Sequence, residues 1–310
     1  MLRPIIMIGC GGFGQRTVRY VRDSVKRQLE HQGWVGDIPK AWQFLVIDHP
    51  HSSKEDPSIP FLPNDAYISL QLPFATYQGL NKAIESKFGL EVNPNAFHKL
   101  QGWRPNPREF MSSYPGQYRA VGRMLGIAGY DTIIKRLSFA FTECAASGPE
   151  LTEVSRYLGV NVPPETPVPD PITIVVGSMA GGTGAGIMLD VVDLVRRADS
   201  KGAFPVLVAF TPDIFGLIQT HAMTANSAAF MAEMLASYWD DEITDSAFIP
   251  ANVDVNTRGP HSIYLIGRTN IDGLDFLDSK SVYQAVGKTL SAIVTSPTLQ
   301  TIFYNFNTIV

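Results

Sequence analysis

The sequence is poor in cysteine and nearly balanced in charge. Its 310 residues include only two cysteines, Cys10 and Cys144, which lack the number and spacing of a disulfide framework or a zinc site. Acidic residues outnumber basic ones by 29 to 25, and a net charge of -4 does not favour a surface for nucleic acid or anionic lipid. No apolar run approaches the roughly 20 residues that span a bilayer. We therefore expect a cytoplasmic protein with neither nucleic acid nor membrane as its partner.

Two ligand-binding patterns are also missing. The lysine-bearing phosphate loop GxxxxGK[ST] does not occur, so any phosphate would be held mostly by backbone amides and helix dipoles. His49 and His51 stand close together, but their proline-rich surroundings favour solvated side chains over metal ligands. The sequence therefore predicts no metal site made of side chains alone.

Five short apolar runs are present, and amphipathic segments separate them. The runs are PIIMIG, FLVID, ITIVVG, FPVLVAF and SIYLIG, which start at Pro4, Phe44, Ile172, Phe204 and Ser262. They do not alternate between apolar and polar residues, which is typical of parallel strands buried on both faces. Helical periodicity follows GCGGFG and AGGTGAG and recurs over about 276–294. The pattern predicts an α/β fold: a doubly wound, mostly parallel sheet with helices on both faces, ending in a long central helix.

The domain organisation is predicted from the same pattern. We expect residues 1–275 to form a nucleotide-binding domain, with loop-rich insertions over 49–170 where prolines and polar residues concentrate. Residues 276–310 are expected to form the central helix and the start of a missing or truncated second domain.

Two glycine-rich loops follow the first apolar run and the ITIVVG run. Without a Cβ, glycine lets backbone N–H groups approach an anion, and the helix that follows adds about half a positive charge at its N-terminus. Thr183 adds a hydroxyl. The helix N-terminus is expected to lower the pKa of the Cys10 thiol, but no His or Asp stands near it in a recognisable arrangement, so we interpret Cys10 as a small loop residue. The candidate phosphate-binding residues are Gly9, Cys10, Gly11, Gly12, Gly14, Gln15, Ala180, Gly181, Gly182, Thr183, Gly184, Ala185 and Gly186.

The segment AGGTGAG, over 180–186, resembles the GGGTGSG signature loop of the tubulin and FtsZ superfamily, with alanine in place of the first glycine and of the serine. GCGGFGQ, over 9–15, is similar to the first nucleotide loop of that superfamily. The likeness is strongest to bacterial tubulin-like proteins and extends from residue 1 to about 295. It implies that the chain binds GTP or GDP with Mg²⁺, acts as a GTPase and assembles with itself, head to tail, into filaments.

The resemblance also implies roles for residues outside these two loops. YPGQYRAVG is a weak match to a γ-phosphate loop, which makes Gly116, Gln117 and Arg119 candidates, with Arg119 as a phosphate cation. Asp213 would face the ribose. Asn226 and Asn270 would read guanine, since an amide offers both a donor and an acceptor. Asp48, which ends FLVID, could accept from the nucleotide or from water bound to Mg²⁺.

An acidic residue expected from the resemblance is missing. In tubulin and FtsZ, the loop after the central helix carries an acid that completes the site of the next subunit, but the last acid here is Asp278. Truncation and a divergent, non-hydrolysing assembly module both account for this. A third alternative is a Rossmann-type NAD-dependent oxidoreductase, in which Gly9, Gly11 and Gly14 form GxGxxG, but its ribose acid should follow sooner than Asp48.

Overall fold

The structure is a computed structural model. It describes residues 1–48, 57–70, 118–163, 165–199, 204–218, 221–239, 259–276 and 278–308, together with isolated residues between 76 and 86. Among these residues, no helix combines the length and the apolar character needed to cross a membrane.

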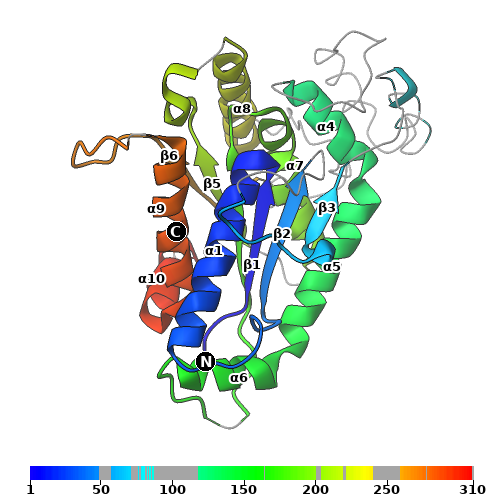
Figure 1. Cartoon of the computed structure of the whole chain (residues 1–310). Helices are drawn as coiled ribbons and strands as arrows, with labels where there is room; N and C mark the ends of the chain where they lie inside the picture. The colour runs from blue at the N-terminus through cyan, green and yellow to red at the C-terminus, as the bar shows by residue number, and fades with distance from the viewer. Residues whose placement is uncertain are drawn as a thin grey trace.

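A six-stranded sheet forms the centre of the protein (Figure 1). All of its strand pairs are parallel, in the order β3-β2-β1-β4-β5-β6. The strands are β1 Ile5–Cys10, β2 Trp42–Asp48, β3 Tyr67–Ser69, β4 Ile172–Ser178, β5 Val206–Phe210 and β6 Ser262–Ile266. The order reverses direction at β1 and β4, where ligands bind in open α/β sheets. The predicted doubly wound α/β fold is confirmed.

Helices cover both faces of the sheet (Figure 1). Alternation along β1 divides the core, because Ile6 and Ile8 belong to one apolar cluster while Ile5 and Met7 belong to the other. The first cluster includes α4 Arg119–Ala128, α5 Tyr130–Ala146, α7 Gly182–Ala198 and α8 His221–Trp239. The second includes α1 Gly11–His31, α6 Gly148–Tyr157, α9 Ser279–Thr295 and α10 Pro297–Thr308. Three of these helices fall within 49–170, where the sequence pattern predicts loop-rich insertions, and β3 lies where one further strand is expected, near DAYISL.

Helices α1 and α9 run side by side in the same direction. Ser24 Oγ donates a hydrogen bond to Ser291 Oγ at 3.0 Å, and one turn further along Thr295 donates to the side-chain oxygen of Gln28. One turn earlier, a Cβ at Gly287 would lie 2.5 Å from Cδ1 of Tyr20. Gly287 therefore lets the Tyr20 ring pack directly against α9, and Tyr283 of α9 contacts Phe13 in the first turn of α1.

The variant Gly287→Val is expected to lower the free energy of unfolding by about 1–3 kcal/mol, because its side chain would overpack against the Tyr20 ring. Lys288→Val is a matched control, since it places the same β-branched side chain at an exposed position of the same helix. Urea denaturation measures both variants. A loss at Gly287 no larger than that at Lys288 would contradict close packing, because helix propensity alone favours valine over glycine and lysine over valine.

Candidate functional site

A cavity of about 290 Å³ lies at the carboxyl ends of β1 and β4, near the lower end of the roughly 300–1,000 Å³ of ligand sites. The loops that follow these two strands form most of its wall. Its lining residues are Cys10, Gly11, Gly12, Phe13, Arg16, Asp48, Ser178, Gly181, Gly182, Thr183, Gly184, Phe215 and Met223. The structure therefore brings residues of both glycine loops together around one space.

A larger hollow of about 680 Å³ lies between α1, α6 and α9, at the C-terminal ends of these helices. Polar side chains on its wall bond to one another, as Gln28 does to Ser24 and to Thr295. The cavity at β1 and β4 is the better candidate site, because backbone donors of two helix ends converge there.

Two helix N-termini open onto the smaller cavity without side-chain caps. Cys10 and Gly181 are the N-cap residues of α1 and α7. The Cys10 side chain makes no capping hydrogen bond, and Gly181 has no side chain that could make one. Neither first turn contains an acidic residue. By contrast, α9 is capped by Asp278, whose carboxylate accepts from Ser281 N at 2.7 Å. The uncapped N–H groups and the two helix dipoles therefore favour an anion in the cavity.

The glycines of the loops have different structural roles. Gly11 has a φ of +70°, and a Cβ there would lie 2.7 Å from Gly184 N. A Cβ at Gly184 would lie 2.9 Å from Ser178 O, so these two glycines let the loops pack against each other. At Gly181, no atom lies within 4 Å of an added Cβ. Gly181 is therefore not required by packing, and its missing side chain leaves space in the cavity.

The remaining loop residues lie in the surrounding packing. Thr183 and Gln15 are both buried, and of the two only Thr183 lines the cavity. Added Cβ atoms at three further glycines would meet neighbouring backbone: Gly9 would meet Gly14 O, Gly14 would meet Val176 O, and Gly186 would meet Arg119 O. Ala180 N donates to Ser178 Oγ at 3.1 Å, and Ala185 O accepts from Arg119. These residues therefore stabilise the loops through close packing and hydrogen bonds with neighbouring segments.

Among the described residues that line the cavity, Arg16 is the one cation and Asp48 the one carboxylate. Asp48 lies at the end of β2, lines the cavity and is 5% exposed. Arg16 was not among the predicted residues, although it lies four positions after Gly12 and so on the same side of α1. That spacing could have identified it from the sequence. The Arg16 side chain suits a negatively charged ligand above the helix N-terminus.

Cys10 is not an activated thiol. Burial raises its pKa well above the usual range, and the nearby Asp48 carboxylate raises it further. The prediction of a lowered pKa at the helix N-terminus is therefore wrong, because loss of hydration and a neighbouring anion oppose the dipole. Burial, with a smaller contribution from Glu143, also raises the pKa of Cys144 to about 12.

Neither cysteine is expected to react with iodoacetamide in the folded protein at pH 8.5. Both raised pKa values leave the thiols protonated at that pH, and only the thiolate reacts. In urea both should be labelled, and mass spectrometry of tryptic peptides distinguishes the two states. Rapid labelling of native Cys10 would show that its thiol is ionised and accessible.

The residues predicted to contact guanine and ribose form hydrogen bonds within the protein. Asn226 is buried on α8, and its Nδ2 donates to Ala180 O at 3.0 Å. Asn270 stabilises its own turn, since its Oδ1 accepts from Asp272 N and Leu274 N at 3.0 and 2.8 Å. Asp213 accepts from Thr211 Oγ1 and from Arg268 N.

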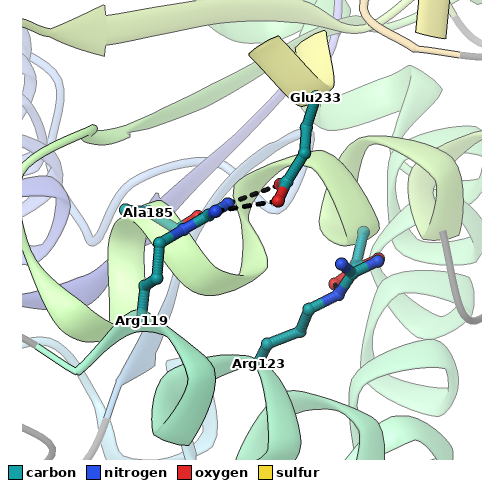
Figure 2. A network of polar contacts seen from close by, with 5 residues as sticks. Arg119, Arg123, Ala185 and Glu233 are labelled. Carbon is teal, nitrogen blue, oxygen red and sulfur yellow. Dashed lines mark hydrogen bonds and ion pairs between the residues drawn. The ribbon is translucent and has the colours of Figure 1, made fainter. Parts of the chain in front are cut away.

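Arg119 lies on α4 and forms an ion pair with Glu233 of α8, as Figure 2 shows. Its predicted neighbours Gly116 and Gln117 lie outside the described residues.

Two glycine loops that lead from adjacent parallel strands into uncapped helices define a doubly wound α/β protein with an anion-suited site at its switch point. The chain belongs to the family described as Tubulin like, whose model matches residues 6–307. The dinucleotide-binding alternative predicts a similar sheet, but the family match favours the tubulin-like interpretation. A search of curated proteins finds no match.

Solved structures of tubulin-like proteins resemble the chain. CetZ from Methanosaeta thermophila strain DSM 6194 is 13% identical with a TM-score of 0.52, and the match covers 100% of this chain and 59% of that one. TubZ of Bacillus thuringiensis serovar israelensis, in a GTPγS-form protofilament, is 13% identical with a TM-score of 0.48, over 96% and 57% of the two chains. The chain thus spans about three fifths of the length of these proteins. At this identity, the likeness to CetZ shows the fold alone.

Proposed function

We propose that the cavity binds a guanine nucleotide, with the phosphates over the N-termini of α1 and α7. The amides of Gly11, Gly12, Gly182, Thr183 and Gly184 would donate to the phosphate oxygens. The observation that carries this proposal is the convergence of two helix ends that have no side-chain cap and no acid in the first turn. The resemblance of AGGTGAG to the tubulin signature loop supports GTP or GDP as the ligand.

The side chains on the wall fit a phosphate ligand that arrives with Mg²⁺. Asp48, Thr183 and Ser178 offer oxygen atoms, which Mg²⁺ prefers, and Arg16 offers a cation to the phosphates. Among the described residues, no group of three or more acidic, histidine or cysteine side chains could hold a metal ion. Mg²⁺ would therefore depend mainly on phosphate oxygens and water, with Asp48 orienting that water. When bound, the ion would neutralise phosphate charge.

Guanine selection is assigned to Asn226 and Asn270, with Asp213 toward the ribose. In the structure these side chains form hydrogen bonds with Ala180, with the turn after β6 and with the segment that follows β6. Binding would thus require Asn270 to present the donor that its turn does not use. This part of the proposal predicts a preference for GTP over ATP.

Assembly and hydrolysis depend on more than one chain. A nucleotide at the exposed end of the sheet would lie between subunits stacked head to tail, a heterologous contact that gives filaments rather than closed rings. The segment after α9 has no acid to orient an attacking water. GTP hydrolysis would therefore need an acid from outside the described site. GTP turnover is compared for this chain and for a longer form, each alone and the two mixed. If they assemble but do not hydrolyse GTP, the protein is a non-hydrolysing assembly module.

The experiment that tests this function is direct identification of the ligand. Nucleotide released from the purified protein is separated by base and phosphate number, and GTP, ATP and NADH are then titrated by calorimetry. We expect GTP or GDP to copurify and GTP to bind more tightly than ATP. Binding of NADH without competition from GTP would support the oxidoreductase, and binding of none of the three would contradict a nucleotide site.

A further inference from the structure

Helix α8 is linked to both ends of the segment 180–185, which comprises the end of the loop before α7 and the first turn of α7. At the start of the loop, Asn226 Nδ2 donates to Ala180 O at 3.0 Å. At the end of the first turn of α7, Arg119 Nη2 donates to Ala185 O at 3.2 Å, and the same guanidinium pairs with Glu233 of α8. Figure 2 shows this guanidinium between α7 and Glu233. The segment 180–185 is therefore held at one end by α8 directly and at the other through Arg119.

The two contacts come from a single face of α8. Asn226 and Glu233 are about two helical turns apart, and Phe230 between them is fully buried in the core. This packing anchors α8 in the apolar cluster that it shares with α7, so both contacts tie the segment 180–185 to the core. The arrangement can set the spacing of the amides that open α7.

The geometry indicates a bracing role for Arg119. Its side chain is 7% exposed and that of Glu233 is 12% exposed, and Nη1 donates to Oε1 at 2.8 Å while Nη2 also pairs with Oε2. A guanidinium held in two places by one carboxylate has its charge locally neutralised and its orientation fixed. Gly186 adds to the fixed geometry, because only the absence of a Cβ lets Arg119 O lie so close to α7.

We propose that the Arg119–Glu233 pair is a brace that positions the amides of Gly182–Gly184, and that Arg119 is a positioning residue rather than a phosphate ligand. The nucleotide part of this inference rests on the proposed function; the loop part does not. The two roles predict opposite signs. If Arg119 were a phosphate ligand, removing the competing Glu233 carboxylate would free its charge and strengthen binding. If the pair is a brace, the same change weakens binding.

The first test needs no nucleotide. Hydrogen exchange is measured for the peptide 178–188 in the wild type, in Glu233→Gln and in the double variant Arg119→Met/Glu233→Leu, which leaves no unpaired buried charge. A brace predicts exchange about tenfold faster in this peptide, with β1 unchanged. Arg196→Gln is the matched control, because Arg196 lies on α7 but donates to Gly259 O, away from the loop. Unchanged exchange in 178–188, or an equal rise throughout the protein, would overturn the brace.

The second test uses GTP affinity. Glu233→Gln should weaken GTP binding about tenfold, although it removes a negative charge, and Arg119→Gln should weaken it by a similar factor. Their combination should be no worse than either alone, because both break the same contact. Arg119→Lys, which keeps the charge pair, should recover part of the loss. Tighter binding in Glu233→Gln would make Arg119 a phosphate ligand. If the wild type binds no GTP, the proposed function fails while the exchange experiment still decides the brace.

Discussion

Gly181→Val should abolish nucleotide binding and leave the nucleotide-free protein folded. Gly181 lines the cavity, and its φ of -82° and ψ of 170° are extended values that valine adopts readily. Because no atom lies within 4 Å of an added Cβ, the Cβ of valine meets no protein atom there. Gly181 lines the cavity as the N-cap residue of α7, so we expect the added side chain to take up space beside the uncapped amides of α7.

Thermal unfolding with and without GTP measures this effect. For the wild type, GTP at 100 times its dissociation constant should stabilise the fold by about 2.7 kcal/mol, a rise in Tm of about 5 °C. In Gly181→Val that rise should disappear, while the Tm without GTP changes by at most about 3 °C.

Gly184→Ala is the matched comparison for this variant. Its Cβ would lie 2.9 Å from Ser178 O and 3.1 Å from Cys10 O, so the loops themselves would have to separate. We expect a lowered Tm even without nucleotide. A Gly181→Val protein that binds GTP like the wild type would place the phosphates elsewhere.

Arg123→Met should be the most destabilising of the substitutions considered, by about 3–5 kcal/mol. The guanidinium of Arg123 bonds both carboxylate oxygens of Asp190, from Nε at 3.1 Å and from Nη2 at 3.2 Å. Both side chains are buried between α4 and α7, at 6% and 4% exposure. Removing the cation would leave a carboxylate in a region where water cannot solvate it.

The double variant Arg123→Met/Asp190→Leu tests that explanation. Replacing both charges by apolar groups avoids the uncompensated carboxylate, so the double variant should be more stable than Arg123→Met alone. Urea denaturation gives the free energy of unfolding of the wild type, of Arg123→Met and of the double variant. If the double variant is less stable than the single one by the full cost of a second independent loss, the pair is not coupled.

Local sequence patterns are sufficient to predict the parallel sheet and the two glycine-rich loops. ITIVVG and FLVID predicted buried parallel strands because a strand covered on both faces needs apolar residues at every position. The glycines marked tight turns into helices because a missing Cβ is a property of the residue itself. The helices within 119–157 are harder to predict, because they lie in the range 49–170, whose prolines and polar residues favour loops.

The roles of single polar residues could not be assigned in the same way. The place of Arg119 in YPGQYRAVG predicts a phosphate contact, whereas its ion pair with Glu233, over a hundred positions away, has no signal in the local sequence. Asn270 was assigned to guanine, yet its side chain also satisfies backbone amides of its own turn. Arg16 lies outside the apolar stripe of α1, so the helical periodicity alone gives no sign that its side chain lines the cavity.

The sequence by itself determined the parallel strands, the two glycine loops and the family resemblance, because strand burial and backbone access are encoded in neighbouring residues. The tertiary structure alone decided which glycine leaves open space, which carboxylate neutralises Arg119 and why Cys10 stays protonated. Those properties depend on desolvation and on charges supplied by distant segments, and only packing brings such segments together.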